Sequence, residues 1–87
     1  MINNKKIVVI MPAYNAEKTL EQTYNELYRD IVDEIILVDD NSSDKTKEVA
    51  KKLGITTIVH DKNKGYGGNQ KTCYTAALKT NADIVIM

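Results

Sequence analysis

Three short polar segments contain the residues best suited to bind a ligand, and each follows directly after an apolar run. They are Pro12 to Asn15, Asp39 to Asp44, and His60 to Gly68. The ring of Tyr14 can stack on a nucleobase, and a carboxylate at the start of the second segment can accept hydrogen bonds from a base or ribose. Glycines in the third segment allow backbone N–H groups to approach phosphate oxygens closely. Each of these chemistries matches one part of a nucleotide.

The first two segments also have a purely structural explanation. Tyr14 can pack against the helix that follows it, and Asp39 and Asp40 can stabilise the N-terminus of the next helix by about 0.3–1 kcal/mol. Consecutive residues of an extended strand point to opposite sides, so this pair alone is poorly placed to bind one metal ion. We therefore expect one of the two carboxylates to accept hydrogen bonds, and at this stage both explanations remain open.

The third segment is predicted to be a loop because it is too rich in glycine and polar residues for a helix or strand. Lys64 or Lys71 could assist the N–H groups of the following helix in binding phosphate, and the alternative is a flexible loop with solvated lysines. A dinucleotide-binding fingerprint is excluded, because Gln70 stands where the third glycine belongs and the loop follows the third strand. We assign a structural role to the lone His60.

An alternation of apolar strands and amphipathic helices must position these segments. Strands are predicted over Ile7–Met11, Glu34–Val38, Ile55–Val59 and Ile84–Met87. Helices are predicted over Ala16–Arg29 with Asn15 as N-cap, over Lys45–Leu53 ended by Gly54, and over Asn69–Lys79 with Cys73, Ala76 and Ala77 facing inward. This alternation predicts an α/β fold in which a parallel sheet has helices on its faces, with ligands bound beyond the carboxyl ends of the strands.

Size, charge and cysteine content limit the classes of function. A chain of 87 residues allows one modest core. Twelve basic and twelve acidic side chains cancel, which argues against binding to nucleic acid or to an anionic membrane surface. No apolar run approaches the roughly 20 residues of a membrane span. The single cysteine, Cys73, fits a reducing compartment, so we expect a cytoplasmic location without a signal peptide.

The three polar segments and the strands before them, in this order and spacing, resemble glycosyltransferase family 2 along the whole chain. Within that family the sequence is most similar to dolichyl-phosphate mannose synthases and other transferases that act on polyprenyl phosphates. The resemblance implies a Rossmann-like nucleotide-diphospho-sugar transferase (GT-A) fold. It also implies transfer of a sugar from a UDP- or GDP-linked donor to an acceptor such as a lipid phosphate, by an enzyme associated with the membrane.

The same resemblance assigns nucleotide-binding roles to particular residues. By position in the motifs, Pro12, Ala13 and Tyr14 line the base pocket, and Asp40 bonds the base with Asp39 beside it. Glu17 and Lys71 are further candidates, although Ala16 separates Glu17 from its expected place and Lys71 corresponds to a basic residue near the diphosphate in some members only. No catalytic residue and no metal ligand is expected here: the family places its divalent Mg or Mn site after the strand ending at Met87, followed by the acceptor half.

Residues 1–87 are therefore expected to form the N-terminal nucleotide-sugar-binding part of a transferase domain. Because the chain ends inside an apolar strand, we expect this fragment to be inactive alone and to self-associate. One alternative is a standalone nucleotide-binding or interaction module without chemistry of its own. A phosphoacceptor signalling domain is disfavoured, because the aspartate pair follows the second strand and no acid ends the third.

Overall fold

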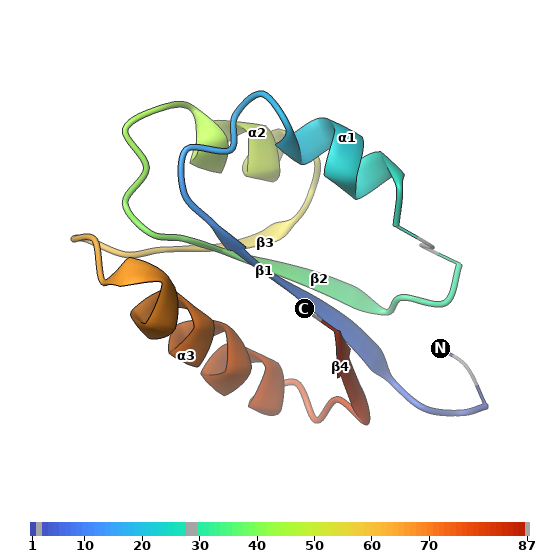
Figure 1. The fold of residues 1–87 in the computed structure, drawn as a ribbon. Coiled ribbons are helices and arrows are strands. Elements are labelled where there is room, and N and C mark those ends of the chain that lie inside the picture. Colours follow the sequence, from blue (N-terminus) through green and yellow to red (C-terminus); the bar gives the residue numbers. More distant parts are fainter. Residues whose placement is uncertain (2, 28–29, 87) are drawn as a thin grey trace.

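Four parallel strands form one sheet in the described part of the chain, in the order β3-β2-β1-β4 (Figure 1). The computed structural model describes residues 1, 3–27 and 30–86. The strands are β1 (Ile7–Ala13), β2 (Glu34–Asp39), β3 (Thr56–Val59) and β4 (Ile84–Ile86). The predicted strands are confirmed within two residues at either end, except that Met87 lies outside the described residues. β1 runs through Pro12, which pairs with Val38 of β2.

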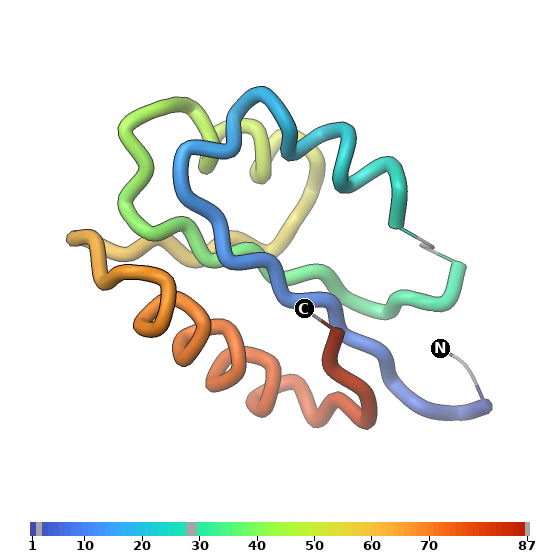
Figure 2. Tube along the Cα trace, in the orientation of Figure 1, coloured from blue at the N-terminus to red at the C-terminus, as the bar shows by residue number. Residues whose placement is uncertain are grey.

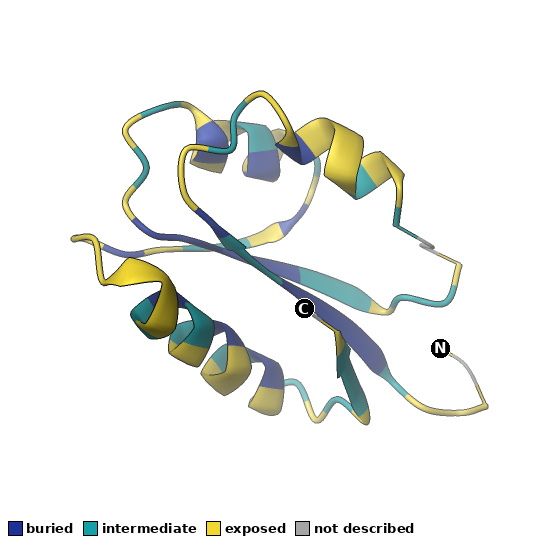
Figure 3. Cartoon of the chain, in the orientation of Figure 1, coloured by how far each residue is buried: buried dark blue, intermediate teal, exposed yellow. Residues whose placement is uncertain are grey.

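The helices cover both faces of this sheet, as predicted. Helices α1 (Leu20–Asn25) and α2 (Thr46–Lys52) lie on one face, and α3 (Gly65–Leu78) lies on the other (Figure 1). α2 ends at Lys52, and Gly54, which was expected to stop it, follows the C-cap Leu53 with a φ of 80°, in the left-handed region that glycine adopts without a steric penalty. The two central strands, β1 and β2, are largely buried (Figure 3), which explains their continuous apolar sequences. The outer strands β3 and β4 are only partly buried.

Alternate residues of the central strands supply two apolar clusters, one on each face of the sheet. Figure 3 shows the buried positions of these strands in dark blue. The cluster under α3 consists of Val8, Ile10, Ile36, Val38, Cys73 and Ala77. The cluster under α1 and α2 consists of Ala13, Leu20, Leu37, Ala50 and Ile55. The predicted inward face of α3 is confirmed, since Cys73 and Ala77 are buried and Ala76 packs against them. Because it is packed on both faces, the sheet is a rigid scaffold for the loops at its carboxyl edge.

Helix α1 begins later than predicted. The expected N-cap, Asn15, has a φ of 52°, and its Oδ1 accepts a hydrogen bond from Ser43 N at 2.9 Å instead of capping its own helix. The N–H of Ala16 donates to Thr46 Oγ1 at 2.8 Å, which ties the segment before α1 to the first residue of α2. The N-cap of α1 is instead Thr19, whose side chain makes no capping hydrogen bond. The predicted residues Tyr28 and Arg29 lie outside the described residues.

Helix α3 begins at Gly65, four residues before the predicted start at Asn69. The glycine-rich segment was predicted to be a loop from its composition, and that prediction is wrong for residues 65–68. Two consecutive N–H groups at this end, those of Lys64 and Gly65, donate to the carboxylate of Asp40 at 2.8 and 3.0 Å. Negative charge and acceptors at a helix N-terminus stabilise the first turn, and here they come from a distant part of the sequence.

Candidate functional site

A pocket of about 290 Å³ opens at the carboxyl end of the sheet, between the end of β1, the end of β2 and the start of α3. Its lining consists of Pro12, Ala13, Tyr14, Asp40, Asn63, Gly65, Tyr66 and Asn69. The structure therefore brings together four residues that the sequence analysis proposed, Pro12, Ala13, Tyr14 and Asp40. They lie at the edge where parallel sheets of this class bind ligands.

Asp40 is the most highly connected side chain of this pocket and is only 3% exposed. Its Oδ1 accepts hydrogen bonds from Lys64 N and from His60 Nδ1, both at 2.8 Å, and its Oδ2 accepts one from Gly65 N at 3.0 Å. Burial raises the pKa of the Asp40 carboxyl, but the hydrogen bonds from His60, Lys64 and Gly65 outweigh burial and hold this pKa below its usual value. Asp40 is thus a fixed, ionised acceptor. Two N–H groups near the start of α3 that were candidates for phosphate binding are already used by this carboxylate.

Acidification is expected to destabilise the fold through this group. The pKa of Asp40 is lower in the folded chain than the unfolded value of about 3.9, so its carboxylate stabilises the fold at higher pH, and this contribution is lost as the pH falls through the folded pKa. We expect the free energy of unfolding, measured with urea, to fall below about pH 4. Asp40→Asn is expected to show a weaker decline over the same range. An equal decline in both proteins would contradict this role of Asp40.

Asn69 connects α3 to the ends of both central strands. Its side chain is buried, and its Nδ2 donates to Val38 O at 3.0 Å and to Ala13 O at 3.5 Å. Its Oδ1 accepts a weak hydrogen bond from Cys73 Sγ. The amide therefore satisfies carbonyl groups at the strand ends and forms part of the pocket wall.

Two tyrosines of the pocket present most of their rings to solvent. Tyr14 follows β1 and is 55% exposed, and Tyr66 lies in the first turn of α3 and is 69% exposed. Both rings line the pocket and are free of a packing role in either apolar cluster. Exposed aromatic rings beside a buried carboxylate are suited to stack on a planar base while the carboxylate bonds its edge.

Figure 2 shows the backbone course of the loops after β1 and β2. Hydrogen bonds join these two loops, and we call them the interloop network. Its members are Asn15, Ala16, Glu17, Ser42, Ser43, Asp44, Lys45 and Thr46. Glu17 belongs to this network, because its Oε1 accepts a hydrogen bond from Lys45 N at 3.2 Å. Glu17 does not line the pocket.

Asp39 faces away from Asp40, as the alternation of a strand predicts. Its Oδ1 accepts hydrogen bonds from the backbone and hydroxyl groups of Ser42. Its Oδ2 is buried and has no hydrogen-bond partner among the described residues. The structure therefore places Asp39 beside the interloop network, outside the lining of the pocket.

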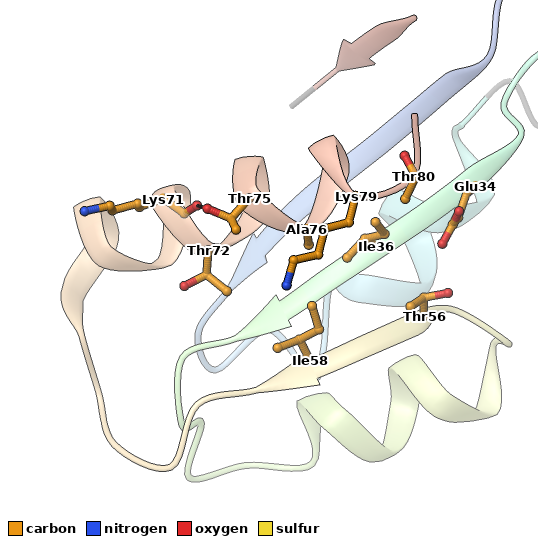
Figure 4. A pocket seen from close by; sticks show the side chains of 10 residues that line it. All are labelled: Glu34, Ile36, Thr56, Ile58, Lys71, Thr72, Thr75, Ala76, Lys79 and Thr80. Carbon is orange, nitrogen blue, oxygen red and sulfur yellow. Dashed lines mark hydrogen bonds between the residues drawn. The ribbon is translucent and has the colours of Figure 1, made fainter. Parts of the chain in front are cut away.

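Lys71 also lies elsewhere, beside a second pocket of about 600 Å³ that α3 forms with β2 and β3 (Figure 4). Ile36 and Ile58 of the strands lie below, and Thr72, Thr75 and Lys79 of the helix lie along the side. The structure thus separates Lys71, Glu17 and Asp39 from the four candidates that meet at the first pocket.

Four residues of the site were not identified from the sequence: Asn63, Tyr66, Asn69 and His60. The first three fall in the segment whose helix start was misplaced, so their common position could not be seen. His60 was assigned a structural role without a partner. The available signal was its position directly after β3, where a polar side chain reaches the same sheet edge as Asp40.

Within residues 1, 3–27 and 30–86, no group of three or more His, Cys, Asp or Glu side chains is arranged to hold a metal ion. Asp39 and Asp40 face opposite sides, so the residues present do not by themselves fit the divalent ion that the family resemblance implies. None of the described helices has the length and apolar character needed to cross a membrane.

Comparisons with known proteins agree with the sequence motifs. The family model described as "Glycosyl transferase family 2" matches residues 8–86. The chain is 40% identical over 85 residues to an uncharacterized protein of Methanocaldococcus jannaschii, covering 98% of this chain and 35% of that protein. It is 34% identical over 100 residues to the UDP-N-acetylglucosamine-dolichyl-phosphate N-acetylglucosaminyltransferase of Methanococcus voltae, covering 95% of this chain and 40% of that enzyme.

The fold matches the crystal structure of glucosyl-3-phosphoglycerate synthase from Mycobacterium tuberculosis in complex with Mn²⁺, uridine diphosphate and glucosyl-3-phosphoglycerate. The TM-score is 0.76 and the sequences are 26% identical, over 94% of this chain and 32% of that chain. This likeness confirms the expected N-terminal portion of a GT-A fold. The chain spans 35% and 40% of the length of the two curated relatives named above.

Proposed function

The chain belongs to glycosyltransferase family 2, and from this we propose that it binds the nucleotide of a nucleotide-diphosphate sugar whose sugar the complete protein transfers to an acceptor. The observation that carries the proposal is the Asp40 carboxylate, held ionised at the wall of a pocket that two exposed tyrosines also line. Membership of a family of transferases favours this function over the alternative of a binding module without chemistry.

The hydrogen bonds of Asp40 favour uracil as the base. Each carboxylate oxygen can accept two hydrogen bonds. Oδ1 already accepts two and Oδ2 accepts one, so the described contacts leave one acceptor position at Oδ2. Uracil presents one N–H group on its pairing edge, whereas guanine presents two adjacent donors that suit a carboxylate with both oxygens free. The uridine diphosphate named with the mycobacterial structure and the UDP-linked donor named for the M. voltae enzyme support the same base.

Four side chains of the pocket then have roles in nucleotide binding. Tyr14 and Tyr66 stack on or flank the base, and Asp40 accepts its N–H group. Asn69 holds α3 against the strand ends and keeps the pocket walls in place. In the complete protein, a divalent ion would neutralise the charge of the departing nucleoside diphosphate. In this proposal, further residues of the complete protein contribute its ligands, since the residues described here do not by themselves fit that ion.

The acceptor in this proposal is a polyprenyl phosphate. Support comes from the M. voltae relative, whose name specifies dolichyl phosphate. A lipid phosphate would bring the complete protein to a membrane surface. Residues 1–87 would then serve the donor half of the reaction, and deprotonation and attack by the acceptor would be the work of other residues.

We expect this chain to bind uridine diphosphate weakly and without dependence on a divalent metal. The pocket for the base is present, and among the described residues no group of three or more His, Cys, Asp or Glu side chains is arranged to hold a metal ion. The measurement is a titration followed by backbone amide chemical shifts. Changes should centre on Tyr14, Asp40, Tyr66 and Asn69, and their midpoint should be the same in Mg²⁺ and in a chelator. Guanosine diphosphate serves as the control and should bind more weakly. Changes confined to Lys71 and the second pocket would refute the site.

A further inference from the structure

His60 is a buried imidazole with a polar contact at each ring nitrogen. It follows β3 directly and is 6% exposed. Its Nδ1 lies 2.8 Å from Asp40 Oδ1, and its Nε2 lies 2.9 Å from Thr72 Oγ1 on the second turn of α3. The imidazole therefore connects the carboxylate of the pocket to the helix that carries Tyr66 and Asn69.

The ionised state of Asp40 determines which ring nitrogen of His60 carries a hydrogen. Asp40 is held ionised, so its oxygens can only accept hydrogen bonds. His60 Nδ1 must then carry a hydrogen, whichever role Nε2 takes toward Thr72. The imidazole donates to Oδ1, the same oxygen that accepts from Lys64 N. Both acceptor positions of Oδ1 are thereby filled, and Oδ2 is the oxygen that remains for a ligand.

We propose that His60 is a positioning residue for the nucleotide site: it fixes the Asp40 carboxylate so that Oδ2 presents its one remaining acceptor position to the base. This inference rests on the proposed function. Without His60, the other two donors contact one oxygen each, so either oxygen has an acceptor position to spare. The imidazole removes this equivalence, and its contact with Thr72 holds the ring in place.

Two substitutions separate the two contacts of the ring. The side-chain amide nitrogen of asparagine lies near the position of Nδ1, and that of glutamine lies near the position of Nε2. His60→Asn therefore keeps a donor for Asp40, whereas His60→Gln keeps a group for Thr72 and loses the donor for Asp40. We expect the dissociation constant for uridine diphosphate to rise about 10-fold in His60→Gln, the scale of one lost hydrogen bond to a charged group, and less than about 3-fold in His60→Asn.

Urea unfolding of both variants accompanies the titrations, so that a loss of binding is compared with any loss of stability. If binding follows stability in both variants, with no advantage for His60→Asn, His60 is a structural residue only and the proposal is wrong. If the unsubstituted chain itself does not bind uridine diphosphate, the proposed function fails instead. The two failures are therefore distinguishable.

A spectroscopic measurement tests the same contact without a substitution in the pair. His60 is the only histidine of the sequence, so ¹⁵N-histidine labelling yields the signals of one imidazole. We expect Nδ1 to be protonated both with and without uridine diphosphate. Thr72→Val, which removes the contact at Nε2, should leave that state of Nδ1 unchanged. A neutral ring that carries its proton on Nε2 would overturn the proposal.

Discussion

Replacing Asp40 with asparagine is expected to weaken the binding of uridine diphosphate about 100-fold and to lower the free energy of unfolding by about 3 kcal/mol. An asparagine oxygen at the Oδ1 position can still accept from His60 and Lys64, but its NH₂ group then takes the Oδ2 position. That NH₂ would face the N–H of Gly65 and the N–H of the base, and all three are donors. Calorimetry and urea unfolding measure the two losses.

Asp39→Asn is the matched control, because it makes the same chemical change at the neighbouring buried residue. The Asp39 oxygen bonded to Ser42 can remain an oxygen in asparagine, and Oδ2 has no partner among the described residues to lose. We expect its free energy of unfolding to change by less than about 1 kcal/mol and its affinity for uridine diphosphate to be nearly unchanged. A larger loss of affinity in Asp39→Asn than in Asp40→Asn would mean that the base lies on the other side of the sheet end.

The elements of this fold were predictable where local sequence determines them. The β-branched run from Ile7 and the run from Ile35 are apolar at every position, which identifies strands buried on both faces. Their alternation with helices then implies a parallel sheet and a ligand at its carboxyl edge. The opposite orientation of Asp39 and Asp40 also followed from local geometry, because successive side chains of a strand alternate.

The start of α3 could not be predicted from local sequence, because its cause is distant in the chain. Glycines at positions 65, 67 and 68 disfavour a helix by about 1 kcal/mol each relative to alanine. The carboxylate of Asp40 satisfies the N–H groups that open this helix, and a contact 25 residues away in sequence is not visible in a local pattern. Placing the helix start at Asn69 concealed Tyr66 as a first-turn residue beside the pocket.

Some nucleotide-binding roles implied by the family resemblance have more structural support than others. Here too, the difference depends on whether local sequence or a distant contact sets the residue's position. Tyr14 and Asp40 follow strands directly, so their positions are set by the sheet. Glu17 lies in a loop, where the interloop network decides which way its carboxylate points. Lys71 lies on a helix whose rotation about its axis is set by the burial of Cys73 and Ala77. A direct nucleotide contact of Glu17 or Lys71 remains a prediction that a titration of each alanine variant can test.

Asn69→Asp is expected to lower the free energy of unfolding by about 3 kcal/mol or more at neutral pH, although it replaces one NH₂ group by an oxygen. The Asn69 amide is 3% exposed and donates to the carbonyl oxygens of Val38 and Ala13. The introduced carboxylate would leave both carbonyls without this donor and would bring a buried negative charge close to them. For 87 residues the total stability is of the order of 4–13 kcal/mol, so this loss is a large fraction of it.

Lowering the pH should reduce the difference in the free energy of unfolding between the Asn69→Asp variant and the unsubstituted chain. Burial against carbonyl oxygens raises the pKa of the introduced carboxyl above its unfolded value, so its destabilising effect is greatest above the folded pKa and diminishes as the carboxyl becomes protonated on acidification. A protonated carboxyl can also donate to Val38 O.

Asn81→Asp makes the same change at an exposed residue after α3, and its free energy of unfolding should change by less than about 0.5 kcal/mol. The measurement is urea unfolding of all three proteins at pH 7 and pH 4.5. A difference between Asn69→Asp and the unsubstituted chain that is no larger than that of Asn81→Asp, or that does not shrink at the lower pH, would show that the Asn69 amide does not hold α3 to the strand ends.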